Sequence, residues 1–393
     1  MKHKKLVHGG VLLFTVVFIL SGIGVSADKA YFSMEPKARK DGRKWRIGYL
    51  EGGPWIEYPQ NLKAVVLGLK ELGWLDISNF PVYKDEHDAS ALWKFVCDNA
   101  KSSYVEFVKD AFWSSGWKDE LREQLIKNCI YRLNIRKDID LMLALGTRAG
   151  QDLATNKISV PTVVIAASDP VAAKIIKSID DSGYDHLHAR VDPTRYVRQI
   201  ELFHDIIEFK KLGIAYENTD AGKSYAALTS VEKVARKRGF EIISCHSKDE
   251  IAEDEEEATN SVIKCYRDLA PKVDAVYIVM QRGITFQTLP KVLAPLIQEK
   301  IPTFSQYGSD EVKYGVLLSI AQAGFKYVGR YTAEVIAKIF NGAKPRDLDQ
   351  VFEDPPKIAI NLKTAIEIGY DPPVDILGAA DEIYQTTRYW GHP

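Results

Sequence analysis

The sequence predicts an α/β protein built from two lobes, each a doubly wound parallel sheet. Segments with strand patterning alternate with segments of helical patterning along most of the chain, which is typical of parallel sheets covered by helices. This alternation restarts near residue 190, so it describes two similar lobes rather than one large sheet. The chain has 393 residues and is 46% hydrophobic, which is sufficient for two cores.

In the first lobe, apolar runs at 45–50, 140–145 and 160–167 predict buried strands. Apolar residues at helical spacing between 58 and 72 predict a helix, and Gly73 ends it. Each predicted strand is followed by a polar or glycine-containing loop and then by a helix. Right-handed crossovers place such loops along one edge of the sheet, where open α/β proteins bind ligands.

Residues 88–137 do not fit a minimal lobe, and we interpret them as a helical insertion dense in aromatic side chains. The aromatic residues are Trp93, Phe95, Tyr104, Phe107, Phe112, Trp113 and Trp117. Their spacing is mostly helical, which favours ordinary core packing. The alternative is a cap beside the ligand site or a surface for a partner protein.

The second lobe shows the same alternation of strands and helices. Strands are predicted at 211–216, 240–244, 274–280 and 301–305, and helices at 196–209, 224–238, 251–270 and 289–300. We therefore expect the second lobe to be a doubly wound parallel sheet similar to the first.

The N-terminus has the pattern of a secretory signal peptide. Basic residues between positions 1 and 5 precede the apolar run 11–20, and Val25-Ser26-Ala27 has the small-x-small pattern of a cleavage site. We therefore expect residues 1–27 to be removed, with the polar segment 28–44 as an extended lead-in and the mature protein in the periplasm. The alternative, an uncleaved anchor, needs about 20 apolar residues, more than this run supplies.

The formal net charge of −1 argues against nucleic-acid binding, which requires a basic face to neutralise phosphates. The sequence contains neither a G-x-S-x-G nor an H-E-x-x-H motif, so we predict no enzymatic activity. The histidines and cysteines are not clustered at metal-ligand spacing, so we predict no metal and no cofactor.

The four cysteines are even in number, which favours disulfides in an oxidising compartment. Cys97 and Cys129 flank one predicted helical region, and Cys245 and Cys265 lie on a predicted strand and the helix after it. We therefore predict the bridges Cys97–Cys129 and Cys245–Cys265. The alternative is four buried free thiols.

The candidate ligand-binding residues are polar, aromatic or glycine residues that directly follow predicted strands. They are Trp55, Gly146, Thr147, Arg148, Ser168, Asp169, Glu217, Asn218, Gln281, Arg282 and Tyr307. Gly146-Thr147-Arg148 opens a helix, where free N–H groups and the helix dipole favour an anion such as a carboxylate. Any one of these loops could be a plain connection, and their shared position at strand ends is the argument for a site.

Several segments, in this order, resemble those of the ABC-transporter substrate-binding family whose characterised members bind tryptophan and other aromatic amino acids. The segment 145–151 (LGTRAGQ) resembles I-G-T-P-A-A-Q, 165–171 (IAASDPV) resembles A-V-T-D-P-V, 274–277 (DAVY) resembles D-A-I-Y, and 360–365 (INLKTA) matches the family's ending. The resemblance extends from about residue 45 to 385. The chain departs from the pattern at Arg148, at 281–283 and in the longer segment 88–137.

The resemblance implies a type I periplasmic-binding-protein fold, whose two lobes are joined by a three-segment hinge. The helix after residue 325 then returns to the first lobe, so the first lobe comprises 45–190 with 306–345, and the second 191–305 with 346–393. The resemblance further implies a monomeric receptor of an ABC importer that delivers a small ligand to membrane permease subunits. An extracytoplasmic sensor for a signalling partner is the alternative, and an exported enzyme is a third possibility.

The expected ligand is a small carboxylate or amino acid with an apolar or aromatic body. Arg148 and Arg282 are the candidate holders of the carboxylate, Trp55 could stack on the body, and Asp169 could accept an amino group. The alternative is that both arginines pair with acids such as Glu217 and latch the closed form.

Overall fold

The computed structural model describes residues 32–81, 87–249, 252, 254–320, 325–353 and 357–388. The expected signal peptide and the beginning of the lead-in therefore lie outside the described residues. The remainder of the lead-in carries no helix or strand. It is joined to the first lobe at Met34, whose carbonyl oxygen accepts a hydrogen bond of 2.9 Å from the Trp74 indole N–H.

The first lobe is a five-stranded sheet in the order β2-β1-β3-β4-β5, with every pair of neighbours parallel. Its elements are β1 (Trp45–Glu51), α1 (Glu57–Glu71), α2 (Ala89–Asn99), β2 (Val105–Ser114), α3 (Asp119–Ile135), β3 (Leu141–Leu145), α4 (Gly146–Leu153), β4 (Thr162–Ile165), β5 (Leu187–Ala189) and α11 (Lys326–Phe340). The segment 88–137 is therefore not an all-helical insertion, because β2 lies in its middle and forms the edge of the sheet.

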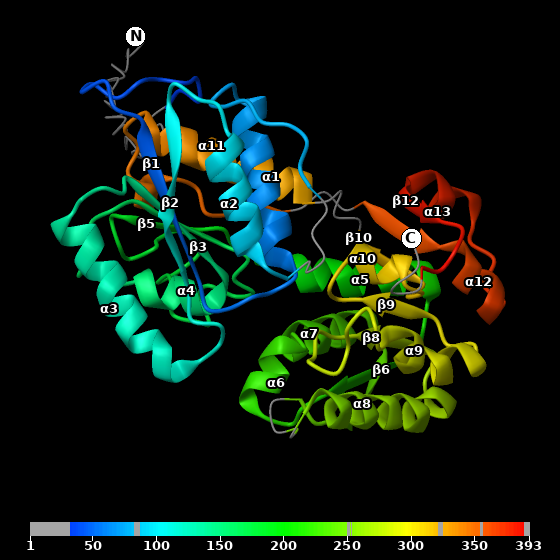
Figure 1. Cartoon of the computed structure of the whole chain (residues 1–393). Coiled ribbons are helices and arrows are strands. Elements are labelled where there is room, and N and C mark those ends of the chain that lie inside the picture. The colour runs from blue at the N-terminus through cyan, green and yellow to red at the C-terminus, as the bar shows by residue number, and fades with distance from the viewer. Residues whose placement is uncertain are drawn as a thin grey trace, which may run out of the picture. The chain divides into compact units, whose positions relative to one another are not determined.

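The second lobe is a seven-stranded sheet in the order β12-β11-β10-β9-β8-β6-β7. Its elements are α5 (Arg195–Ile207), β6 (Lys211–Tyr216), α6 (Asp220–Tyr225), α7 (Leu228–Arg238), β7 (Glu241–His246), α8 (Glu255–Leu269), η1 (Ala270–Lys272), β8 (Ala275–Ile278), α9 (Leu289–Gln298), β9 (Thr303–Ser305), α10 (Ser309–Lys313), β10 (Leu318–Ile320), β11 (Ile358–Asn361), α12 (Leu362–Ile368), α13 (Val374–Ala379) and β12 (Ala380–Tyr384). The short 3-10 helix η3 (Pro345–Asp347) contacts β5 of the first lobe. Of the described strand pairs, β10 with β11 is antiparallel and the others are parallel. Two largely parallel sheets with helices confirm the predicted α/β fold (Figure 1).

Each strand of the first sheet turns alternate side chains to opposite faces. On one face Tyr49 and Leu143 pack with α1, α2 and α11, and on the other Leu50 and Met142 pack with α3 and α4. The second sheet is divided in the same way. Strands such as β3, β4 and β8 are buried on both faces and are therefore continuous apolar runs, which is why they could be recognised in the sequence.

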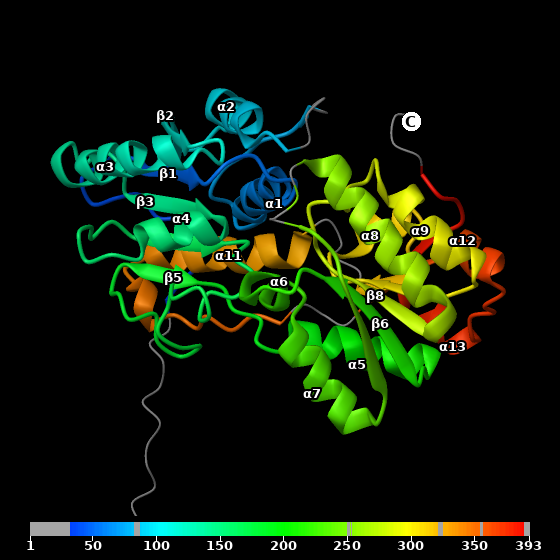
Figure 2. The ribbon, with the colours of Figure 1, turned by 90° about the horizontal axis from the view of Figure 1, so that it is seen from below.

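The chain passes between the two sheets three times, as predicted. It leaves the first sheet after β5, returns to it with α11 and leaves it again before β11. The orange helix α11 lies among the early elements of the chain rather than beside its sequence neighbours (Figure 2). The segment 306–345, expected as a whole in the first lobe, thus divides: α10 and β10 join the second sheet and α11 the first.

The connection that follows β5 and the connection that precedes β11 are hydrogen-bonded to each other. The Val191 N–H donates to the Gln350 carbonyl oxygen at 2.7 Å, and the Phe352 N–H donates to the Val191 carbonyl oxygen at 3.0 Å. Beside them, the buried carboxylate of Asp192 pairs with Arg198 at 2.7 Å. These contacts make the two connections a short parallel ribbon rather than two independent linkers.

One of the two predicted disulfides is present. Cys245 on β7 and Cys265 on α8 are bridged, and both pack on the same face of the second sheet. The predicted Cys97–Cys129 bridge is wrong, because both are free cysteines. Cys97 packs with the cluster under α1 and α2, whereas Cys129 packs under α3 on the opposite face, so the first sheet separates the two thiols.

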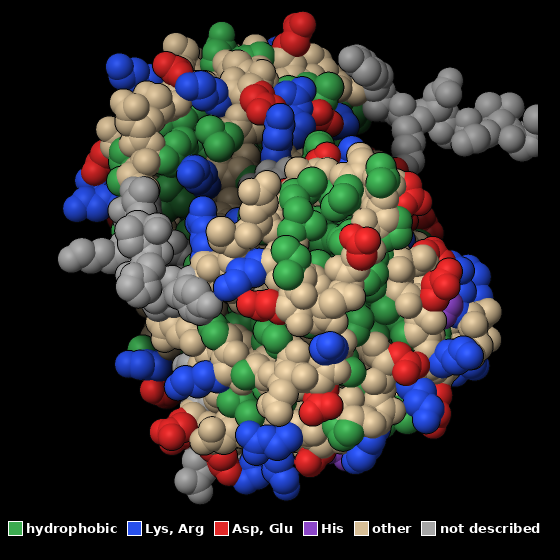
Figure 3. Space-filling model, turned by 90° about the vertical axis from the view of Figure 1, so that its right-hand side faces the viewer, with side chains coloured by type: hydrophobic (Ala, Val, Ile, Leu, Met, Phe, Trp, Pro, Cys, Tyr) green, Lys and Arg blue, Asp and Glu red, His purple; other side chains and the backbone are tan. Residues whose placement is uncertain are grey.

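The surface carries both signs of charge. On the face shown in Figure 3, Lys and Arg side chains are interspersed with Asp and Glu rather than separated into large regions of one sign. Among the described residues, no helix has the length and apolar composition needed to cross a membrane. Nor does the described part of the chain bring three or more His, Cys, Asp or Glu residues together as a metal site.

Candidate ligand-binding site

The candidate site of the first lobe is the edge where the parallel strands end. Strands β1, β3 and β4 are neighbours in the sheet, so the loops that follow them lie side by side. The first of these loops carries Trp55, whose side chain is 40% exposed. The second is the start of α4 at Gly146, Thr147 and Arg148, where the N-cap residue makes no side-chain hydrogen bond to the first helical N–H groups.

Gly146 allows the Tyr58 side chain to lie closer to the start of α4 than a residue with a Cβ would permit. Its φ of +85° is in the left-handed region, and a Cβ at this position would lie 1.8 Å from the Tyr58 hydroxyl oxygen. The buried Tyr58 ring comes from the first turn of α1, and burial raises its pKa, so the hydroxyl stays protonated. The start of α4 thus combines backbone N–H groups with a phenol that can donate a hydrogen bond.

Arg148 places a positive charge at this edge. Its guanidinium lies 2.7 Å from the Asp119 carboxylate at the start of α3 and 5.6 Å from the centroid of the Trp117 ring, over which it is placed. The Arg148 side chain is 37% exposed and that of Asp119 76% exposed, so both remain accessible to a solute. The partner of Arg148 is an acid of its own lobe rather than Glu217.

Glu51, the last residue of β1, is a buried carboxyl below this edge. Burial raises its pKa from 4.5 to about 7, although the hydroxyls of Tyr49 at 2.7 Å and Ser114 at 2.9 Å donate to its oxygens. The nearby charge of Asp88 contributes in the same direction as burial. Near neutral pH this carboxyl is therefore divided between its protonated and ionised forms.

The raised pKa of Glu51 predicts a pH-dependent stability. An acid whose folded pKa lies above its unfolded value favours the folded state at low pH, so its contribution is lost as the pH rises from 4.5 through 7. We expect Glu51→Gln to be more stable than the parent above pH 7, by up to about 3 kcal/mol, and to show little difference at about pH 4.5. Thermal unfolding of both proteins between about pH 4.5 and 8.5 measures this. Parallel curves for the two proteins would contradict the prediction.

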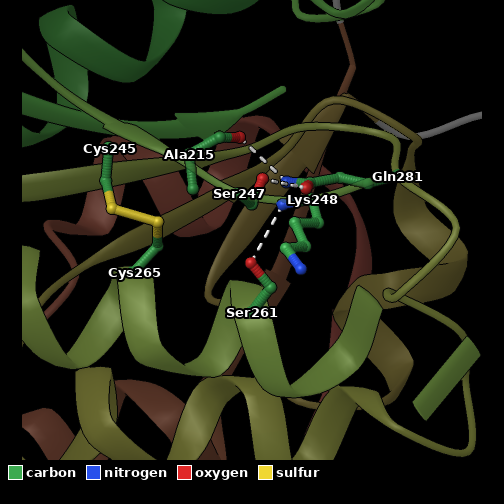
Figure 4. The surroundings of a disulfide bond; sticks show 7 residues. All are labelled: Ala215, Cys245, Ser247, Lys248, Ser261, Cys265 and Gln281. Atoms are coloured by element: carbon green, nitrogen blue, oxygen red, sulfur yellow. Dashed lines mark hydrogen bonds between the residues drawn. A yellow bond between two sulfur atoms is a disulfide. The ribbon is translucent and has the colours of Figure 1, made fainter. Parts of the chain in front are cut away.

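Two candidate residues of the second lobe have structural partners. The Gln281 amide donates to the Ala215 carbonyl oxygen at 2.8 Å and accepts from the Ser247 hydroxyl at 2.7 Å, as Figure 4 shows. The buried carboxylate of Glu217 accepts from the Asp249 N–H at 2.7 Å and from the Thr219 hydroxyl at 3.2 Å. Both side chains therefore hold loops in place at the end of β6.

The remaining second-lobe candidates differ in accessibility. Arg282 is exposed, its N–H donates to the Asp249 carboxylate at 2.6 Å, and its guanidinium donates to the Ala252 carbonyl oxygen at 3.2 Å. Asn218 is exposed. Tyr307 is buried, burial raises its pKa, and its carbonyl oxygen accepts from Arg195 at 3.4 Å. Among these three, Arg282 and Asn218 present side chains that a solute can reach.

In the loop after β4, the Asp169 carboxylate forms hydrogen bonds within its own turn. Asp169 accepts hydrogen bonds from the Val171 and Ala172 N–H groups at 3.1 and 2.9 Å through one oxygen, Oδ1. It therefore stabilises the turn in which it lies, in the manner of an Asx turn. The preceding Ser168 is exposed.

Four residues of the first-lobe edge were not among the sequence candidates: Glu51, Tyr58, Trp117 and Asp119. Glu51 ends a strand, and the rule applied to the other loops would have included it. Trp117 and Asp119 follow β2, a strand hidden within the segment interpreted as helical. Tyr58 begins a helix, and only the close approach to Gly146 shows its relation to α4.

The chain matches the sequence profile of a family described as ABC transporter substrate binding protein over residues 109–384, more than half of its length. It is 24% identical over 277 residues to the tyrosine-binding protein of Clostridioides difficile (strain R20291), and the alignment covers 68% of this chain and 75% of that protein. The resemblance inferred from the sequence motifs is thereby confirmed.

Solved structures show the same fold. The structure of an ABC domain in complex with L-Trp from Streptococcus pneumonia has a TM-score of 0.60 at 22% identity and covers 87% of this chain and 100% of its own. The ligand-free, open structure of a substrate binding protein with adhesive properties from Clostridium difficile has a TM-score of 0.62 at 19% identity and covers 88% and 100%. The architecture is that of the type I periplasmic binding proteins.

Proposed function

The chain belongs to the ABC transporter substrate-binding protein family, and on that premise we propose that it is the periplasmic receptor of an ABC importer. It binds a small organic carboxylate or amino acid with an apolar or aromatic body, closes its two lobes on this ligand and delivers it to membrane permease subunits. The three connections between the sheets supply the hinge, and the ligand stabilises the closed form by contacting both lobes.

The observation that carries the ligand class is the composition of the first-lobe edge. Arg148, whose guanidinium is accessible, is the third residue of α4, and the Tyr58 hydroxyl lies against Gly146, the first residue of this helix. Guanidinium and helix N–H groups both bind carboxylates. The exposed indole of Trp55 supplies apolar surface on the neighbouring loop. A tyrosine-binding relative and a tryptophan complex of the same fold support an aromatic amino acid as the first ligand to test.

A thermal-shift screen of residues 28–393 tests this function. The probes are L-tyrosine, L-tryptophan, L-phenylalanine, L-leucine, benzoate and D-ribose. A true ligand at about 100 times its dissociation constant is expected to add about 2.7 kcal/mol of stability. Stabilisation by ribose and by none of the carboxylates would refute the proposed ligand class. Loss of uptake of the identified ligand in a strain lacking this chain tests the transport role.

Arg148→Ala is expected to weaken binding of the identified carboxylate about 10- to 100-fold, because a hydrogen bond to a charged group contributes about 1.5–3 kcal/mol. The amide of the same ligand should lose much less affinity. Arg136→Ala is the matched control, since Arg136 is an exposed arginine of the same lobe that pairs with Asp138 at 2.9 Å. Isothermal titration calorimetry gives each dissociation constant. An equal loss for the acid and its amide would favour a latching role of Arg148 instead.

A further inference from the structure

Trp117 has an unusual backbone conformation for a bulky residue. It lies between β2 and α3 with φ of +65°, directly after Gly116 with φ of +60°. A side chain of this size rarely occupies the left-handed region, because Cβ crowds the neighbouring carbonyl oxygen. Such strain persists only where surrounding contacts enforce it, and it is concentrated at functional sites.

Two hydrogen bonds hold Trp117 in this conformation. Its backbone N–H donates to the Gly52 carbonyl oxygen at 2.9 Å, and its indole N–H donates to the Pro54 carbonyl oxygen at 2.9 Å. The Ser115 hydroxyl donates to the same Gly52 oxygen at 2.7 Å. The loop after β1, which leads into Trp55, is thus clamped by the segment after β2.

The Trp117 indole packs against Gly52 and Gly53. A Cβ at Gly53 would lie 2.6 Å from Trp117 Cγ, and a Cβ at Gly52 would lie 2.9 Å from Trp117 Cζ3. Nevertheless 40% of Trp117 is exposed, and the guanidinium of Arg148 lies over the ring at 5.6 Å. Strain, hydrogen bonds and glycines therefore combine to keep a large aromatic surface in contact with water, beside the cation of the site.

We propose that Trp117 is the specificity-determining residue of the ligand site, and that its exposed indole packs against the ring of a planar aromatic ligand whose carboxylate binds Arg148. This inference rests on the function proposed above. The indole and the guanidinium are held against each other, so they present an apolar surface and a positive charge at a fixed separation. An aromatic amino acid or aromatic carboxylate carries an aromatic ring that can contact the indole and a carboxylate that can bind the guanidinium. An aliphatic amino acid has the carboxylate but a smaller apolar group.

Trp117→Gly is the decisive variant, because glycine accepts φ of +65° without strain and only the indole is lost. Trp117→Phe keeps a ring but lacks the N–H that binds Pro54. Tyr131→Ala is the matched control, since Tyr131 is a 64% exposed aromatic residue on α3. Calorimetric titration with L-tyrosine, L-tryptophan and L-leucine should show roughly a tenfold or greater loss of affinity for the aromatic ligands in Trp117→Gly. The same variant should change leucine binding much less, by under about threefold, Trp117→Phe should be intermediate, and Tyr131→Ala should match the parent.

The outcomes separate this inference from the function on which it rests. If the parent protein binds none of the screened carboxylates, the proposed function fails. If the parent binds an aromatic ligand and Trp117→Gly binds it equally well, the role of Trp117 is refuted while the function stands. An equal loss for leucine and tyrosine, or a parent that binds leucine alone, also refutes specificity. Thermal unfolding of each variant confirms that it is folded.

Discussion

Replacement of Gly329 by leucine is expected to lower the free energy of unfolding by about 3 kcal/mol or more. A Cβ at Gly329 on α11 would lie 2.4 Å from the carbonyl carbon of Ala64 on α1, and the contact is with backbone, which cannot rotate away. Gly68 faces it reciprocally, with a Cβ 2.7 Å from the Gly329 carbonyl oxygen. The two helices cross at this pair of glycines, and a larger side chain must push them apart.

Urea denaturation followed by circular dichroism measures this loss. Gly378→Ala is the matched control, because a Cβ at Gly378 in α13 would meet no atom within 4 Å and the residue has no positive φ. The control should be neutral or slightly stabilising, since alanine is the better helix former. Helix α1 also carries Tyr58, so Gly329→Leu should weaken ligand binding as well. Unchanged stability would mean that α1 and α11 do not cross with their backbones in contact at this pair of glycines.

Removal of the Cys245–Cys265 bridge, by replacing both residues with alanine, is expected to cost about 3 kcal/mol. The bridge closes a loop with a sequence separation of 20, and restricting a loop of this size in the unfolded chain gives this magnitude. The loop contains Ser247, whose hydroxyl donates to Gln281 (Figure 4). It also contains Asp249, whose N–H donates to Glu217. The double variant should therefore also loosen the strand ends of the second lobe.

Chemical denaturation of the double variant measures the cost, and Cys97→Ala, which removes a free thiol, serves as the control. The control should retain most of the parent's stability. Alkylation of the unfolded, unreduced parent should label two cysteines, at positions 97 and 129. Labelling of all four cysteines, or a double variant as stable as the control, would show that the bridge does not form.

The alternation of strands and helices was visible in the sequence because buried parallel strands are continuous apolar runs. The first predicted strand, 45–50, is β1, and the helix predicted at 58–72 is α1, at Glu57–Glu71. Strand β2 was missed because its pairing with β1 shifts register between Ile47 and Tyr49, which interrupts the alternation of buried and exposed residues. Its aromatic residues then have a spacing that also fits a helix.

Long-range pairing was harder to predict. The positions of β10 and β11 depend on which strands they meet in the sheet, and local pattern does not contain that information. The cysteine pairs were predicted from proximity in sequence. This succeeded for Cys245 and Cys265, which lie on the same face of the second sheet. It failed for Cys97 and Cys129, which lie on opposite faces of the first sheet.

The candidate site was predictable as a place but not as a set of contacts. Residues that directly follow predicted strands were taken as candidates, and this identified the edge of the first sheet on which Arg148 is accessible. The sequence could not show that Gln281, Glu217 and Asp169 form hydrogen bonds with neighbouring loops and turns. Nor could it show that Trp117 would be clamped onto Gly52 from a different strand.

The position of α11 also determines the order in which the chain can fold during synthesis. Part of this helix belongs to the cluster that covers one face of the first sheet, through Ala333, Val335, Ile336, Ala337, Ile339 and Phe340. When the last strand of that sheet, β5, has left the ribosome at residue 189, these residues have not yet been made. The first lobe therefore cannot complete its core until most of the second has emerged. A chain built in this way stays incompletely folded through most of its translation, which is the condition in which a protein can be threaded through a membrane.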